Sequence, residues 1–148
     1  MITIEVITIL KASYMYLKEH CAKYGIILTA YSPLGGSPVD PAFEKAMTGV
    51  MNFDVRRGLF NNPVILDLAK KYGKTVGQIL LKFQTSRGII VIPKSVTKSR
   101  IIENAALFDF DFTKDEIAKI EALNCNMRFA DLKNWMGKAK NYMYNIEY

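Results

Sequence analysis

The sequence predicts an α/β fold in which parallel strands are covered by helices, and three observations support this prediction. Short β-branched, apolar segments alternate with amphipathic helical segments along the 148 residues. The connections between successive strands are long enough to hold helices, as parallel pairing with right-handed crossovers requires. Half of the residues are hydrophobic and 23% are charged, which is typical of a single globular domain with an ordinary core.

Three segments have the composition of buried strands: residues 2–10 (ITIEVITIL), 26–31 (IILTAY) and 88–92 (GIIVI). A parallel sheet needs both faces covered, and a sheet of only three strands leaves two open edges. We therefore expect this sheet to be part of a larger α/β sheet. Alone, the chain is expected to self-associate through its exposed edges and apolar surface, or to adopt a loosely packed state.

Start and stop signals mark the first two helices. A helix over residues 14–24 ends at Gly25, which suits a C-terminal cap. The next begins at Asn62-Pro63, because proline is favoured in the first helical turn, and it ends at Gly73. Helical spacing places these apolar side chains on the inner faces: Leu17, Cys21, Tyr24, Val64, Ile65, Leu68, Ala69 and Tyr72.

Capping boxes at residues 75–78 (TVGQ) and 113–116 (TKDE) open two further helices. A helix between them starts at Thr97 or Ser99 and runs to about Leu107. The inward-facing side chains expected from the two capped helices are Ile79, Leu80, Phe83, Ile117, Ile120 and Leu123.

Two long segments have no strand pattern. Residues 32–62 exceed the roughly 2–6 residues that commonly connect elements of compact α/β units, and residues 41–51 within them predict a short helix. A loop of this size at the carboxyl end of a strand is more often a functional lid than an accident. Residues 124–148 show no periodicity and predict a long tail.

Composition argues against several classes of protein. No apolar run reaches the roughly 18 residues of a membrane helix, and Glu5 interrupts an N-terminal stretch that also lacks the basic start of a secretory signal. Cys21, Cys125 and His20 cannot form a four-ligand zinc site or a disulfide framework, so we expect a cytoplasmic protein with reduced cysteines and no metal. The net charge of +6 is spread along the chain, which favours solvated helix faces and no nucleic-acid partner.

The polar groups of a candidate site follow two of the predicted strands. Residues 30–35 (AYSPLG) come at the end of the second strand, and residues 92–97 (IPKSVT) at the end of the third. Parallel α/β folds bind ligands at the carboxyl ends of their strands, and the loops after the last two strands of a barrel are a favoured phosphate site.

The second of these segments has the chemistry of an anion cradle. Lys94 leaves the strand end, and Ser95, Val96 and Thr97 offer backbone N–H groups at a helix start. Arg100 lies one helical turn beyond Thr97 and faces the same way. The alternative is a solvent-exposed capping turn with two ordinary basic residues, and the residue types alone favour neither interpretation.

In these segments the sequence resembles the C-terminal part of the aldo-keto reductases. The matching positions are residues 21–26, 30–35, 92–97, Arg100, Glu103, Asn104 and 108–110. Residues 30–35 and the run from Ile92 to Asn104 are similar to that family's cofactor signatures, in the same order and at a similar spacing. The resemblance extends from about Thr3 to Tyr148, nearly the whole chain.

The resemblance implies a partial (β/α)8 TIM barrel, of which this chain holds the last three strand–helix units, with NADP(H) bound in an extended form. No G-x-G-x-x-G or P-loop motif occurs in the sequence. By the same resemblance, Tyr31 stacks on the nicotinamide ring, and Ser32 and Leu34 contact the pyrophosphate side. The other implied cofactor-binding residues are Lys94, Ser95, Thr97 and Arg100 at the adenosine phosphate and Glu103 and Asn104 at the adenine. Val96, between Ser95 and Thr97 in the sequence, is also included.

Three departures from the family's pattern stand out. The family's catalytic Asp, Tyr, Lys and His lie on earlier strands, and no stretch of this chain matches them. Thr3 replaces the glutamine that usually grips the nicotinamide amide, and residues 7–9 (ITI) replace the usual His-Pro. Gly36 is inserted before Ser37-Pro38, so the lid residues that clamp the cofactor have no assigned position.

We therefore expect residues 1–148 to form a single, incomplete oxidoreductase domain: a fragment, a truncated product or a degenerate relative. No catalytic residue is assigned, and the chain alone is expected to reduce no aldehyde. Residues 124–148 either pack or, by the resemblance, face a small carbonyl substrate in a complete enzyme. The alternative is a non-enzymatic nucleotide-binding or protein-interaction remnant of the family.

Overall fold

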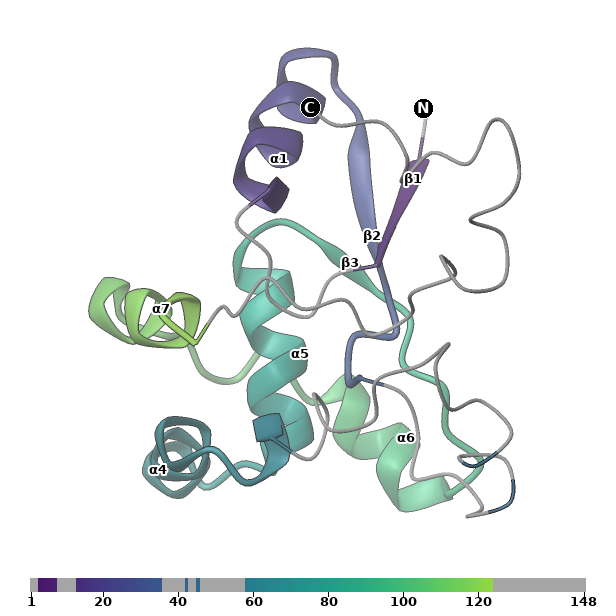
Figure 1. Cartoon of the computed structure of the whole chain (residues 1–148). Coiled ribbons are helices and arrows are strands. Elements are labelled where there is room, and N and C mark those ends of the chain that lie inside the picture. Colours follow the sequence, from purple (N-terminus) through teal and green to yellow (C-terminus); the bar gives the residue numbers. More distant parts are fainter. Residues whose placement is uncertain (1–2, 8–12, 36–41, 43–44, 46–57, 124–148) are drawn as a thin grey trace.

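A computed structural model of the chain describes residues 3–7, 13–35, 42, 45 and 58–123 (Figure 1). The strands form one sheet in the order β1 (Thr3–Ile7), β2 (Ile27–Tyr31) and β3 (Ile90–Val91). All pairings are parallel, with Ile7 opposite Tyr31 and Ala30 opposite Val91. The predicted parallel sheet is confirmed for the described strands, and their carboxyl ends lie at one edge.

The described helices with assigned bounds are α1 (Ser13–Lys23), α4 (Pro63–Tyr72), α5 (Val76–Ser86), α6 (Lys98–Ala105) and α7 (Lys114–Glu121). α1 connects β1 to β2 and packs on β2, whereas α5 leads into β3 and contacts it. In Figure 1, α4 and α7 lie on one side of α5, and α6 lies on the other side, near the segment that follows β2.

The predicted helix signals are confirmed. Asn62 Oδ1 accepts the Val64 N–H at 2.9 Å, and Gly73 ends α4 with a φ of 61°. α5 and α7 each begin with a complete capping box, in which the N-cap threonine and the side chain three residues later accept each other's backbone N–H. Such signals are local because the first N–H groups of a helix have no partner within it.

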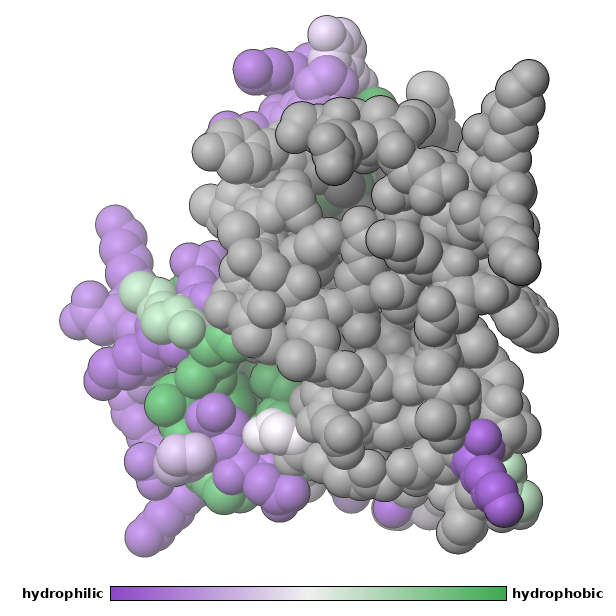
Figure 2. Space-filling model, in the orientation of Figure 1, coloured by the Kyte–Doolittle hydropathy of each residue, from purple (hydrophilic) through white to green (hydrophobic). Residues whose placement is uncertain are grey.

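Most of the described core lies among α4, α5 and α7, which together form the α4–α5–α7 layer. α5 is buried around much of its circumference, and Ile79 and Leu81 are both 0% exposed. The buried members of this cluster are Leu59, Ile65, Leu68, Ala69, Ile79, Leu80, Phe83 and Ile120. Figure 2 shows apolar residues gathered over this layer with hydrophilic residues around them. Full burial of each large aliphatic or aromatic side chain contributes about 1.5–3 kcal/mol to folding.

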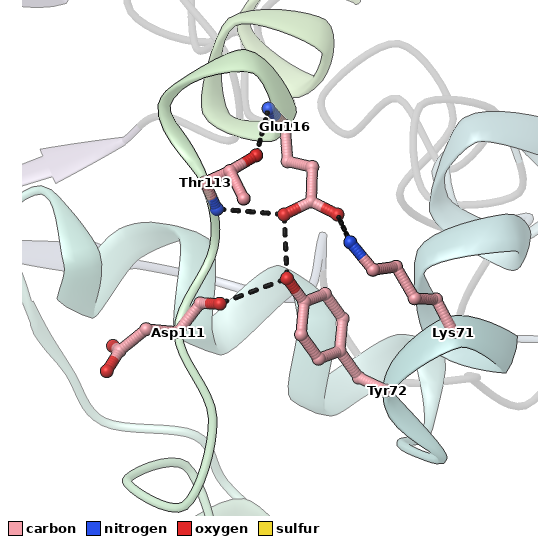
Figure 3. Close-up of polar contacts among 5 residues, drawn as sticks. All are labelled: Lys71, Tyr72, Asp111, Thr113 and Glu116. Carbon is pink, nitrogen blue, oxygen red and sulfur yellow. Dashed lines mark hydrogen bonds and ion pairs between the residues drawn. The ribbon is translucent and has the colours of Figure 1, made fainter.

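Glu116 joins α7 to α4 (Figure 3). One carboxylate oxygen accepts from Lys71 Nζ at 2.6 Å, and the other accepts from the Tyr72 hydroxyl at 2.7 Å and from the Thr113 N–H at 2.8 Å. The Tyr72 hydroxyl also lies 3.0 Å from the Asp111 carbonyl oxygen. Burial raises the pKa of Glu116, but these hydrogen bonds outweigh burial and lower the pKa from 4.5 to about 2. The same carboxylate raises the pKa of both Lys71 and Tyr72.

Two predictions about these elements are wrong. Tyr24 is 69% exposed instead of facing inward, because α1 ends one residue earlier and the Tyr24 N–H closes a turn onto the Cys21 carbonyl. The third strand is shorter than residues 88–92. Its first residues still belong to the turn that ends α5, in which the N–H groups of Gly88 and Ile89 bond to carbonyls of that helix.

Other boundaries differ or fall elsewhere. α6 ends at Ala105 rather than near Leu107, because the chain leaves the helix and buries Leu107, which is 2% exposed. The short helix predicted over residues 41–51 lies almost wholly outside the described residues, as does the tail over residues 124–148. Among the helices that the structure describes, none combines the length and apolar character needed to cross a membrane.

Candidate functional site

A cavity of about 910 Å³ lies at the carboxyl ends of β2 and β3. Its wall consists of the segments that follow these strands, the beginning of α5 and one side of α6. All the residues for which the sequence analysis implies cofactor contacts line it: Tyr31, Ser32, Leu34, Lys94, Ser95, Val96, Thr97, Arg100, Glu103 and Asn104. The structure thus brings together two segments that are far apart in the sequence.

The wall after β2 contains a strained turn. Ser32 has a φ of 50°, and it is the one non-glycine residue with a positive φ among the described residues. The Gly35 N–H closes the turn by donating to the Ser32 carbonyl oxygen at 2.8 Å. Pro33 restricts Ser32 further, since a residue before proline favours extended backbone. Strain of this kind costs about 1–3 kcal/mol and is concentrated at functional sites.

The segment that follows β3 differs from the predicted anion cradle in one backbone N–H. The Thr97 N–H donates to Ser95 Oγ at 3.2 Å, so the expectation that this N–H is free for an anion is wrong. A serine hydroxyl readily accepts an N–H two residues ahead in such a turn. Thr97 is the N-cap residue of α6, but its side chain makes no capping hydrogen bond. Ser95, two residues earlier, therefore supplies the side-chain oxygen of this turn.

Two positive charges at the cavity have no partner among the residues that the structure describes. Within the described residues, neither Lys94 nor Arg100 has a hydrogen bond or ion pair through its side chain, and both residues are exposed. Glu103 is the acidic residue on the described wall. Three lysines of the α4–α5 region are instead paired with carboxylates: Lys71, Lys74 and Lys82. An ammonium and a guanidinium without partners in a cavity favour a multiply charged anion such as a phosphate.

The structure also adds residues that the sequence analysis did not assign. Thr75, Val76 and Gly77 line the cavity at the first turn of α5, and Phe60 lies nearby on the wall. A signal for the first three was present in the sequence. Because α5 leads directly into β3, it runs back along the sheet and must begin at the edge where the strands end.

Comparison with known proteins agrees with this arrangement. The model of the aldo/keto reductase family matches residues 6–125. The chain belongs to the aldo/keto reductase family. Human aldo-keto reductase family 1 member A1 is 44% identical over 113 residues, which cover 76% of this chain and 32% of that protein. The chain therefore spans about a third of the length of this curated relative.

Solved structures of the family show the same relationship. An aldo-keto reductase from Bombyx mori, crystallised in complex with NADP, is 38% identical with a TM-score of 0.68, and the match covers 90% of this chain and 39% of that one. The aldose reductase from Schistosoma japonicum has a TM-score of 0.75 at 28% identity, covering 99% of this chain and 41% of its own. These neighbours have the TIM-barrel fold, and the parallel sheet described above matches part of it.

Proposed function

We propose that this chain forms the NADP(H)-binding part of an aldo-keto reductase and contributes the last three strand–helix units of its (β/α)8 barrel. The observation that supports this most strongly is that one cavity at the ends of β2 and β3 is lined by all the residues for which the resemblance implies cofactor contacts. The related Bombyx mori enzyme, crystallised with NADP, supports the choice of cofactor.

The chemistry of the wall fits the parts of this cofactor. Tyr31, 42% exposed at the cavity, offers a flat ring on which the nicotinamide stacks. The strained turn at Ser32 and Leu34 lies beside the pyrophosphate. Lys94 and Arg100 bind the phosphate on the adenosine ribose.

The remaining signature residues complete the adenosine end. Ser95 and Thr97 contact the same phosphate, with Val96 between them on the exposed rim. Glu103 and Asn104, on the last turn of α6, contact the adenine. The Glu103 carboxylate can accept hydrogen bonds from the N–H donors of the adenine base. It has the same sign of charge as the phosphate, which binds at the other end of the wall.

The reaction needs groups beyond these. When bound, NADPH would supply the hydride for reduction of a small carbonyl substrate, and the residues named above would orient the ring and the phosphates. No general acid is proposed within residues 1–148, and residues 124–148 are left to pack or, in a complete enzyme, to face the substrate. The chain alone consequently consumes no NADPH when aldehydes are added. Consumption above the blank would show that this assignment is wrong.

Cofactor preference tests the proposal directly. The whole chain is titrated with NADPH and with NADH, and the fluorescence of the reduced nicotinamide reports binding. Two charge-assisted hydrogen bonds of about 1.5–3 kcal/mol each predict a preference for NADPH on the order of a hundredfold or more at low salt. Added salt should narrow the preference, because these cations are exposed. Equal affinity for the two cofactors, or no binding of either, would overturn the proposal.

A further inference from the structure

α6 carries part of the cavity wall but has little apolar attachment of its own. Arg100, Glu103 and Asn104 all lie on this helix and line the cavity. None of the residues of α6 is buried, and Ile101 and Ile102 are 53% and 62% exposed within the described structure. Polar contacts therefore have an unusually large part in fixing the position of this helix.

Gln78 on α5 supplies such contacts. Its side chain lies in a buried position, with the residue only 6% exposed. Its Nε2 donates to the carbonyl oxygen of Glu103 at 3.1 Å and to that of Ala106 at 3.0 Å. The Glu103 carbonyl oxygen also accepts the Ala106 N–H at 3.1 Å, so the amide adds a second hydrogen bond there. The Ala106 carbonyl lies just past the end of the helix, where carbonyls lack N–H partners within it, and the amide supplies it with a donor.

The same amide also belongs to the first turn of α5. Its Oε1 accepts the Thr75 N–H at 2.9 Å as one half of the capping box. Thr75 to Gly77 line the cavity, as does the turn of α6 that Gln78 holds. One buried side chain, with both amide hydrogens donated, thus ties together the two helical parts of the wall. Gln78 itself does not line the cavity.

We propose that Gln78 is a positioning residue for the adenosine-phosphate end of the cavity. It holds the last turn of α6 against the first turn of α5, and this sets the place of Arg100 relative to Lys94. The ligand named here rests on the proposed function, whereas the attachment of α6 does not.

Two substitutions separate the amide's roles. Gln78→Glu keeps an oxygen acceptor for the Thr75 N–H but places a second carboxylate oxygen against the carbonyls of Glu103 and Ala106. Gln78→Met keeps a similar length and removes both kinds of hydrogen bond. Thr113→Ala is the control, because it removes the other half of a capping box, the bond from the Glu116 N–H to the N-cap hydroxyl, from α7, away from the cavity.

Two measurements are made on the whole chain. Hydrogen exchange over residues 101–106 should become about tenfold faster or more in both Gln78 variants, as expected for the loss of two hydrogen bonds. The ratio of NADPH to NADH affinity should fall by a similar factor, because displacement of a binding group by about 1 Å is costly. Thr113→Ala should change neither the exchange of α6 nor the ratio.

Each outcome decides the inference. Unchanged α6 exchange in a folded Gln78 variant would overturn it, and so would equal losses of NADPH and NADH affinity, since these indicate general destabilisation. If Gln78→Glu does not fold, Gln78→Met decides. If the wild-type chain binds neither cofactor, the proposed function is wrong. The positioning role of Gln78 is then decided by hydrogen exchange alone: faster exchange of α6 in the Gln78 variants supports it, and unchanged exchange contradicts it.

Discussion

The α4–α5–α7 layer and the cavity wall formed by residues 29–34 and 92–97 with Arg100, Glu103 and Asn104 are built in opposite ways. The layer buries its large apolar side chains and pairs the carboxylate of Glu116 with three donors. The wall leaves Ile92 and Val96 70% and 83% exposed, and its two cations have no partner in the described residues. The residues that stabilise the fold and the residues that are available to a ligand therefore lie in different parts of the chain. The layer stabilises the chain, whereas the wall keeps groups that a ligand can satisfy.

Removal of buried volume from the layer should have the largest effect. Phe83 is 1% exposed, and Phe83→Ala is expected to lower the free energy of unfolding by about 3–5 kcal/mol. Val96→Ala, at a position that is 83% exposed on the wall, should change it by no more than about 0.5 kcal/mol. Urea unfolding of both variants measures the difference. Similar losses would show that the wall is as much a part of the core as the layer is.

Removal of a cation from the wall should weaken NADPH binding and leave the stability of the fold nearly unchanged. Lys94→Met and Arg100→Met are each expected to weaken NADPH binding by about 1.5–3 kcal/mol. Both should leave NADH binding and the free energy of unfolding nearly unchanged. Lys98→Met is the control, because Lys98 is exposed on α6 but does not line the cavity. Titration with both cofactors tests this, and an equal effect of Lys98→Met would point to general electrostatic attraction instead.

Acid should weaken the layer through Glu116. Its pKa is about 2 in the folded chain against 4.5 ordinarily, so its stabilising contribution is present above pH 4.5 and is lost as the pH falls toward 2. Because the Lys71 side chain is 56% exposed and screened by water, we expect a loss of about 1–2 kcal/mol rather than the full value of the shift. Unfolding free energies measured from pH 6 to 2 should show this slope in the wild type and lack it in Glu116→Gln. Asp115→Asn, at an exposed position of the same helix, should keep the slope. A slope unchanged in Glu116→Gln would contradict the assignment.

Relief of the strained turn should have the smallest effect. Ser32→Gly is expected to raise the free energy of unfolding by about 0.5–1 kcal/mol, since glycine accepts a positive φ without a steric penalty. It should also weaken cofactor binding if the Ser32 hydroxyl contacts the pyrophosphate. Thermal unfolding and NADPH titration of the same sample check both expectations. A less stable variant would show that the turn is not strained.

The two regions also differ in how far the sequence predicts them. Helix starts such as Thr75 and Thr113 can be predicted because capping is decided by residues a few positions apart. The wall residues can be predicted as a group because the carboxyl ends of parallel strands meet at one edge. The exposure of Tyr24 cannot be predicted, because helical spacing does not tell where the helix ends. The bond from Gln78 to Glu103 joins positions 25 residues apart and depends on tertiary packing.

Unfolding of the wild type and of Arg100→Met, with and without NADPH, tests most directly whether stability and binding are held separately. Without cofactor, the two proteins should have the same free energy of unfolding. With NADPH at a hundred times the wild-type dissociation constant, the wild type should gain about 2.7 kcal/mol and Arg100→Met much less. A lower stability of Arg100→Met without cofactor, or an equal gain in both proteins, would contradict this separation.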